Sequence, residues 1–117
     1  MNILFIGLGG FLGAISRYLL NEVVIKYIPT YFPTGILIVN ILGCLVIGLF
    51  LGNSIISKDY MYYFFGIGFL GSFTTMSAFS YQTIELFNTN ILIACSYIIL
   101  TLALTILATY IGINFSK

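Results

Sequence analysis

The sequence predicts an all-α integral membrane protein with four transmembrane helices. Hydrophobic residues make up 61% of the chain and charged residues only 6%, whereas soluble domains carry roughly 25% charged residues. The chain also contains four apolar stretches, each long enough for the about 20 residues that a helix needs to cross a bilayer. These stretches account for nearly all of the 117 residues, so we expect one four-helix domain covering residues 1–117.

The four predicted spans follow one another through short connections, which makes consecutive helices antiparallel neighbours. An even number of spans places both termini on the same side of the membrane. The predicted spans are residues 3–26, 33–56, 61–85 and 90–113, and the connections between them contain Pro29 and Pro33, then Asn53 and Ser57-Lys58-Asp59, then Asn88-Thr89-Asn90. Two glycine pairs, Gly9 with Gly13 and Gly48 with Gly52, have the spacing that lets membrane helices approach closely.

The distribution of positive charge gives almost no orientation signal. Lys58 and Lys117 belong to the side of the termini, whereas Lys26 and the more deeply placed Arg17 belong to the other side. The positive-inside rule fixes orientation only where one side carries a clear excess of Lys and Arg. We therefore predict dual topology, in which the chain inserts both ways and pairs with its own inverted copy as an antiparallel dimer.

The composition excludes several classes of function. The chain has no His, and its three acids, Glu22, Asp59 and Glu85, are far apart in sequence. A metal-ligand cluster or a Ser/His/Asp triad cannot be assembled from these residues, so we predict that the protein is not an enzyme. A net charge of +1 offers no basic patch for nucleic acid. We interpret Cys44 and Cys95 as small hydrophobes and expect no cleaved signal peptide at the N-terminus.

The third span contains the most unusual segment of the chain, Gly71-Ser72-Phe73-Thr74-Thr75-Met76-Ser77-Ala78-Phe79-Ser80. Five of these ten residues carry hydroxyl groups at a depth where lipid would otherwise surround the helix. Polar groups at that depth are costly unless they face protein, water or an ion. The segment therefore predicts a broken helix near the bilayer midplane, with carbonyls such as those of Gly71 and Thr74 freed to hold a small cation.

Other polar residues lie deep in the predicted spans, and each has two interpretations. Asn40 either bonds a neighbouring helix or presents its amide donors to an anion. Arg17 either bonds backbone carbonyls or Asn21, or attracts an anion to a vestibule. A third feature is the row of hydroxyl side chains in the fourth span, which either bond their own helix or line a polar pathway; its members are Tyr97, Thr101, Thr105 and Thr109.

The third span contributes two further candidate side chains, Met76 and Phe79. They are three residues apart and share a helix face. Aromatic rings on membrane helices usually pack against helices or lipid. A ring also has an electropositive edge that can face an anion. Under the second interpretation, these residues would line an anion pathway whose candidate members are Asn40, Met76, Phe79 and the first three members of the hydroxyl row.

Three motifs of this sequence resemble those of the Fluc/CrcB family of fluoride channels. They occur in the same order as in the family, and the resemblance covers essentially the whole length of the chain. They are Gly9-Gly10-Phe11-Leu12-Gly13-Ala14-Ile15-Ser16-Arg17-Tyr18, Pro33-Thr34-Gly35-Ile36-Leu37-Ile38-Val39-Asn40-Ile41-Leu42-Gly43 and the Gly71–Ser80 segment. The resemblance implies a passive channel that exports cytoplasmic fluoride across a bacterial-type plasma membrane. It also implies an antiparallel dual-topology homodimer with two fluoride pores.

The resemblance also assigns roles to individual residues. It implies a structural Na⁺ at the dimer centre, held by the main-chain carbonyls of Gly71 and Thr74. The residues that match the family's pore positions are Asn40, Phe79, Tyr97 and Thr101, and Arg17 matches the family's first-helix arginine.

The sequence departs from the family pattern at three positions. Met76 stands where the family usually has its first pore phenylalanine, Ala78 where Thr is common and Gln82 where Glu is common. Met76 opens the alternative that the chain works as a heterodimer with a paralogue. A small multidrug exporter would share the size and topology, but it needs an acid deep in the first span, and Glu22 lies near the end of that span.

Overall fold

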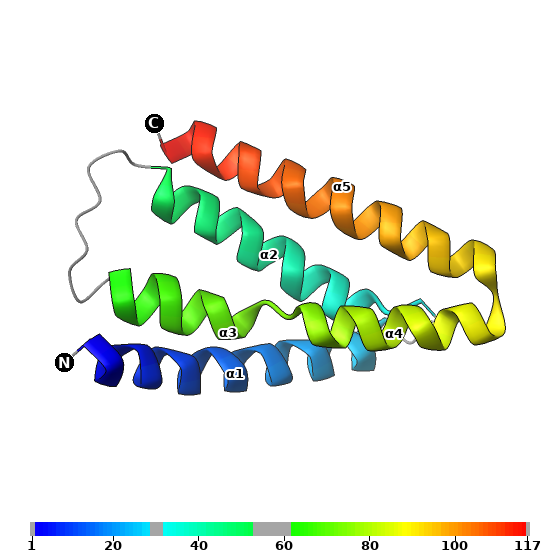
Figure 1. Ribbon diagram of the computed structural model, residues 1–117, viewed down its shortest axis with the longest axis horizontal. Helices are drawn as coiled ribbons and strands as arrows, with labels where there is room; N and C mark the ends of the chain where they lie inside the picture. The colour runs from blue at the N-terminus through cyan, green and yellow to red at the C-terminus, as the bar shows by residue number, and fades with distance from the viewer. Residues whose placement is uncertain (1, 29–31, 53–61, 117) are drawn as a thin grey trace.

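The computed structural model describes residues 2–28, 32–52 and 62–116, and within these ranges it is helical with no strand. This confirms the predicted all-α class. Lys58 and Lys117, on which the predicted charge balance depends, lie outside the described residues. The elements are α1 (Asn2–Tyr27), α2 (Thr34–Leu51), the π-helix η1 (Tyr62–Leu70), the short α3 (Gly71–Phe73), α4 (Met76–Thr89) and α5 (Ile91–Ser116), as Figure 1 shows.

Among the described residues, three helices, α1, α2 and α5, are long and apolar enough to cross a membrane by themselves. The predicted third span is instead divided into two halves. The first half consists of η1 and α3, and the second half is α4, with Thr74 and Thr75 between them in non-helical conformation (Figure 1). The predicted break in the third span is thus confirmed, although it lies three residues beyond Gly71, which remains helical.

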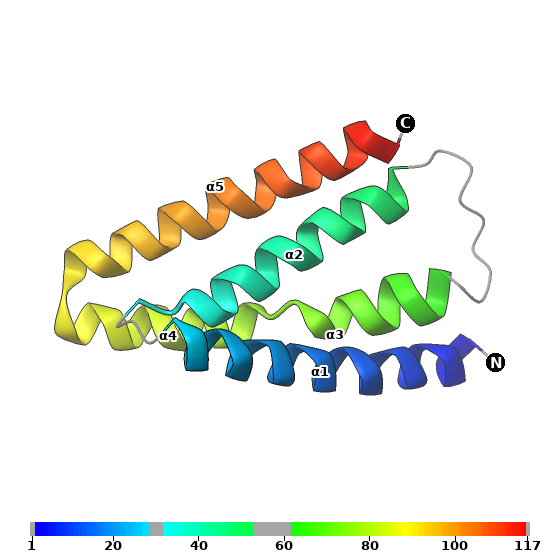
Figure 2. The ribbon, with the colours of Figure 1, turned by 180° about the vertical axis from the view of Figure 1, so that it is seen from behind.

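The helices form a bundle in which both ends of the chain lie at the same end of the molecule (Figures 1 and 2). This agrees with the predicted even number of spans. Helix α1 packs mainly along η1 and α3, whereas α2 packs mainly along α5. The second half of the broken span, α4, contacts α5 as well. The break therefore lies where the two pairs of helices meet, close to the middle of α2.

The first half of the broken span has a feature that the sequence did not predict. Residues Tyr62–Leu70 form a π-helix, a conformation that is rare and is often found at functional sites. The π-helix leads directly into α3, and α3 ends at the break. The polar Gly71–Ser80 segment is thus preceded by an unusual helix as well as interrupted by extended residues.

Both predicted glycine pairs lie at close helix contacts, as their spacing indicated. A Cβ atom at Gly9 would overlap the Phe64 carbonyl of η1, and one at Gly48 would overlap the Thr109 carbonyl of α5. The second members of the pairs, Gly13 and Gly52, likewise face the backbones of η1 and α5. These contacts let α1 lie close against η1 and let α2 lie close against α5.

Replacing Gly9 with Ala should lower the thermal stability of the purified protein in detergent. The added methyl group overlaps backbone, and overpacking of this kind costs about 1–3 kcal/mol. Gly7→Ala is the matched control, because Gly7 has open space around its Cβ position and Ala favours a helix over Gly by about 1 kcal/mol. Equal melting temperatures for the two variants would contradict the close contact between α1 and η1.

The interior of the bundle is small, and most large apolar side chains of α1 and α5 point outward. Val39 of α2 and Tyr97 of α5 are the largest fully buried side chains. Tyr97 packs with Leu37 and Leu86 in a cluster between α2, α4 and α5. An apolar exterior around a narrow core is what a bilayer requires, and the buried polar residues gather beside this core.

Candidate functional site

The break between α3 and α4 is a stretch of two extended residues. Thr74 has φ −81° and ψ 155°, and Thr75 has φ −147° and ψ 121°. On the α3 side, the Thr74 backbone N–H and its hydroxyl both donate to the Leu70 carbonyl, at 3.2 and 3.1 Å. On the α4 side, the Thr75 hydroxyl accepts a hydrogen bond from the Ala78 N–H at 3.2 Å and so caps the helix.

Asn40 of α2 holds the break open through two hydrogen bonds to one residue. Its Oδ1 accepts from the Thr75 N–H at 2.8 Å, and its Nδ2 donates to the Thr75 carbonyl at 3.2 Å. Because these two backbone groups are bound by a side chain, they are not available for a continuous helix. A nearby glycine, Gly43, lets Thr74 lie against α2, since a Cβ there would overlap the Thr74 methyl group. Asn40 thus acts here as a clamp between helices.

The clamp leaves backbone carbonyls of the break without partners. In a continuous helix, the N–H groups of Thr75 and Ala78 would bond the carbonyls of Gly71 and Thr74. Those N–H groups instead donate to side chains, and neither carbonyl has a hydrogen-bond partner among the described residues. Gly71 also has open space at its Cβ position. The two carbonyls predicted to hold a cation are therefore ones that the break releases.

A pocket of about 190 Å³, hereafter the inner pocket, lies beside the break. It contains five of the six predicted pore residues. Its lining consists of Asn40, Cys44, Thr74, Thr75, Met76, Phe79, Thr101, Leu102 and Thr105. Residues from α2, α4 and α5 and from the break therefore converge on one small cavity, although they are up to 65 positions apart in the sequence.

Thr101 is the unusual polar residue of the inner pocket. Its side chain is only 6% exposed, and its hydroxyl has no hydrogen-bond partner. The next two hydroxyls of the row differ, because Thr105 donates to the Thr101 carbonyl and Thr109 to the Thr105 carbonyl. A buried hydroxyl without a partner is costly. Within the row, Thr101 is therefore the threonine with a free proton to offer a ligand.

Met76 and Phe79 both line the inner pocket but differ in exposure. Met76 begins α4 and is 69% exposed, whereas Phe79 is half-buried and its ring centroid lies 5.1 Å from that of Tyr97. Cys44 also lines the pocket, which the sequence analysis did not predict. The signal for Cys44 was its spacing, since it follows Asn40 by four residues and so lies on the same helix face.

Tyr97 is the one predicted pore residue that does not line the inner pocket. It is completely buried, and its ring contacts those of Phe79 and Phe32, with centroid distances of 5.1 and 5.4 Å. Its hydroxyl donates to Oε1 of Gln82 at 3.0 Å. The phenol hydroxyl is therefore directed to a residue that lines a second cavity.

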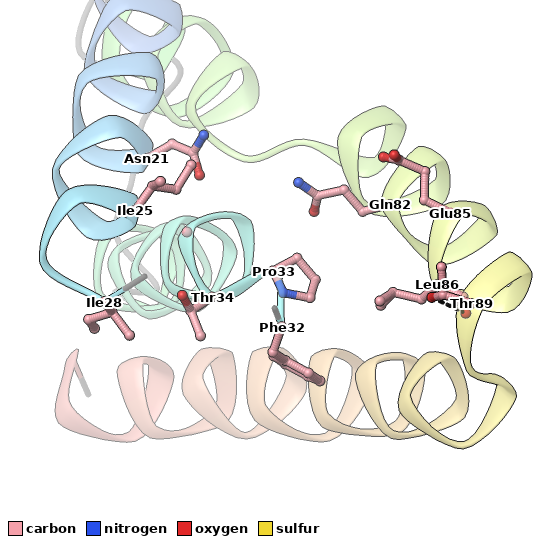
Figure 3. Close-up of a pocket in the computed structure, with 11 residues that line it drawn as sticks. Asn21, Ile25, Ile28, Phe32, Pro33, Thr34, Gln82, Glu85, Leu86 and Thr89 are labelled. Atoms are coloured by element: carbon pink, nitrogen blue, oxygen red, sulfur yellow. Dashed lines mark hydrogen bonds between the residues drawn. The ribbon is translucent and has the colours of Figure 1, made fainter. Parts of the chain in front are cut away.

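This second cavity, hereafter the outer pocket, has a volume of about 400 Å³ and lies between the end of α1, the start of α2, and α4 (Figure 3). The Gln82 side chain extends across it toward Asn21 of α1 (Figure 3). Its lining consists of Asn21, Ile25, Ile28, Phe32, Pro33, Thr34, Gly35, Gln82, Glu85, Leu86 and Thr89. The sequence did not predict this cavity, because its residues come from three separate elements without a shared motif.

Arg17 lies away from both pockets. Its Nε donates to the Ser72 carbonyl at 3.2 Å, which agrees with the interpretation that it bonds backbone carbonyls. The Ser72 hydroxyl in turn bonds the Gly10 and Gly68 carbonyls, each at 2.9 Å. These bonds tie α1 to the first half of the broken span. The vestibule role of Arg17 stays a prediction.

Comparison with known proteins relates the chain to membrane channels. The family described as "CrcB-like protein, Camphor Resistance (CrcB)" matches residues 4–113. Proteins named "Fluoride-specific ion channel FluC" match over nearly their whole length. The one from Flavobacterium psychrophilum is 43% identical, covering 98% of this chain and 96% of the relative. That from Clostridium novyi is 40% identical, covering 92% and 87%, and that from Thermosipho melanesiensis is 37% identical, covering 96% and 93%.

These relatives are named as ion channels, in agreement with the prediction of a protein that is not an enzyme. They come from bacteria, and the chain has long apolar helices like those of a multi-pass protein of the bacterial plasma membrane. The family match covers far more than half of the chain, and identities near 40% extend over almost all of it. The chain therefore belongs to the CrcB family.

Proposed function

We propose that the protein is a fluoride-selective passive channel that exports cytoplasmic fluoride. The observation that carries this proposal is the unpartnered, buried hydroxyl of Thr101, a residue that lines the inner pocket. A free proton donor in a small, mostly apolar cavity suits a small anion that accepts hydrogen bonds. The names of the relatives indicate fluoride as that anion.

The inner pocket offers several weak contacts rather than one strong site. The Thr101 hydroxyl supplies one donor, and Asn40 supplies a second, because only one of its two amide N–H groups is needed for the bond to Thr75. The positive edge of the Phe79 ring adds a contact without a full charge. Multiple weak contacts allow an ion to replace its water and still leave. Transport would follow the electrochemical gradient.

The proposed assembly is an antiparallel dual-topology homodimer with two pores. The near absence of charge bias supports insertion in both orientations. The outward face beside the break supports a partner there, because Gly71 has open space and Met76 is 69% exposed. A heterodimer with a paralogue is the alternative, and it is motivated by Met76 in place of the usual phenylalanine.

The proposed cation of the assembly is a structural Na⁺ at the dimer centre. The carbonyls of Gly71 and Thr74 suit such an ion, because unwound helices in membrane transporters coordinate Na⁺ through freed carbonyls. Both lack partners among the described residues. When bound, Na⁺ would supply positive charge at a fixed point and link two copies of the chain. The break itself is held by Asn40.

Expression of the chain should restore growth in millimolar fluoride to a bacterial strain that lacks its own fluoride exporter. Resistance to quaternary ammonium dyes should not change, because the inner pocket has no carboxylate in its lining and Glu85 of the outer pocket lies on α4 rather than deep in the first span. Growth curves with fluoride and with dye measure both properties in one strain. Dye resistance without fluoride resistance would contradict the proposal and favour a multidrug exporter.

Modification of Cys44 by a small neutral methanethiosulfonate should block fluoride efflux, since Cys44 lines the inner pocket. The reagent converts the thiol to a mixed disulfide with loss of sulfinic acid, which adds volume to a cavity of about 190 Å³. Cys95 is exposed outside that pocket, so it provides the matched control. Efflux through the Cys95→Ala variant should be blocked, whereas efflux through Cys44→Ala should continue. The reverse pattern would place the ion path elsewhere.

A further inference from the structure

The Tyr97 ring contacts one residue of each pocket. It is completely buried, and its ring centroid lies 5.1 Å from that of Phe79, which lines the inner pocket, and 5.4 Å from that of Phe32, which lines the outer pocket. Tyr97 belongs to the lining of neither cavity. Tyr97 therefore links the linings of the two pockets through direct ring contacts.

The Tyr97 hydroxyl has one proton, and in this structure that proton is held by Oε1 of Gln82 at 3.0 Å. Gln82 lines the outer pocket, and its side chain extends into the cavity (Figure 3). An anion that arrives in the outer pocket would need the same proton to bind Tyr97. Gln82 and the anion therefore compete for one donor.

We propose that Gln82 is a latch on Tyr97, which fluoride opens by taking over the hydroxyl proton from Oε1 of Gln82. The proposal rests on the proposed fluoride function and adds an entry step to it. The exchange is favourable because hydrogen bonds to an ion are stronger than those between neutral groups. The Gln82 amide N–H groups, which have no partner among the described residues, remain in the outer pocket as donors for the arriving ion.

The chemical character of Gln82 matters for this step. A neutral amide accepts the Tyr97 proton weakly enough for an anion to displace it. A carboxylate at the same position would hold the proton more strongly and would also repel an anion. The latch therefore predicts opposite effects for two substitutions. Gln82→Ala should speed fluoride entry because it frees the proton, and Gln82→Glu should slow it.

The test is fluoride efflux from liposomes that contain the full chain, measured with Gln82→Ala and Gln82→Glu in the wild-type and Tyr97→Phe backgrounds. We expect Gln82→Ala to raise the initial rate several-fold when Tyr97 is present and to have no such effect with Tyr97→Phe. Glu85→Ala is the matched control, because Glu85 lines the same pocket but has no bond to Tyr97. The effects of Glu85→Ala and Tyr97→Phe on the initial efflux rate should be additive. Slower efflux with Gln82→Ala, equal in both backgrounds, would overturn the latch.

A second measurement separates the latch from the channel proposal. Tyrosine labelled with ¹³C at Cζ reports on its hydroxyl in NMR spectra, and the Tyr97 signal is identified by its absence in Tyr97→Phe. Titration with fluoride should shift this signal at lower concentrations in Gln82→Ala than in wild type. Equal titration curves would overturn the latch whether or not fluoride crosses the membrane. Absence of efflux from well-folded wild type would overturn the channel proposal alone.

Discussion

Replacing Thr101 with Val should reduce fluoride efflux about 10- to 100-fold while leaving the protein as stable as wild type or more stable. Val has the shape of Thr but lacks the hydroxyl. A hydrogen bond to a charged group contributes about 1.5–3 kcal/mol, and each 1.36 kcal/mol changes a rate about tenfold. The free energy of unfolding should stay the same or increase, because an unpartnered buried hydroxyl costs ~1–3 kcal/mol.

The control for this prediction is Thr109→Val, in the same row of hydroxyls on α5. The Thr109 hydroxyl donates to the Thr105 carbonyl of its own helix, and Thr109 does not line the inner pocket. Its replacement should leave fluoride efflux near the wild-type rate. Efflux rates and melting temperatures of both variants measure the two effects separately. Wild-type efflux through Thr101→Val would remove the basis for placing fluoride in the inner pocket.

Replacing Asn40 with Leu should abolish both the clamp and the ion path. Leu has a similar volume but cannot bond the Thr75 N–H and carbonyl, which Asn40 holds at 2.8 and 3.2 Å. Each backbone group left unpaired in a buried position costs about 1–3 kcal/mol. We therefore expect a clear drop in melting temperature together with loss of fluoride efflux, because both the break and one donor disappear.

Asn90→Leu is the matched control for the Asn40 substitution. Asn90 lies in the turn before α5, where its Oδ1 accepts a hydrogen bond from the Leu92 N–H at 3.0 Å. Loss of that cap should cost about 1 kcal/mol without affecting efflux per folded channel. If Asn40→Leu keeps wild-type efflux, then neither the clamp nor the amide donor is needed for conduction.

Much of the fold could be predicted from the sequence because a bilayer imposes simple rules. Length and hydropathy located all four spans, and the hydroxyl-rich segment between Gly71 and Ser80 located the break. The segment did not specify which residues of it are extended, because this depends on Asn40, which binds Thr75 from another helix. The π-helix was also missed, since η1 consists of ordinary apolar and aromatic residues with no local signal for that conformation.

The individual residues of the polar site could be predicted from the sequence, but their hydrogen-bond partners could not. Spacing placed Thr101 and Thr105 on one face, yet both could equally have bonded their own helix. The structure distinguishes them, because Thr105 does bond its helix and Thr101 does not. Tyr97 was expected beside them, but its hydroxyl is directed to Gln82. Such differences depend on which neighbours lie opposite each side chain, and those neighbours are far away in the sequence.

Ion efflux from liposomes that contain only this purified chain tests most directly whether it is a fluoride channel. A fluoride electrode measures fluoride loss, and a chloride electrode measures chloride loss from matched liposomes. We expect rapid fluoride loss with no chloride loss above that of protein-free liposomes. Retention of fluoride by liposomes that contain well-folded protein would contradict a homodimeric channel, and equal loss of both ions would contradict fluoride selectivity.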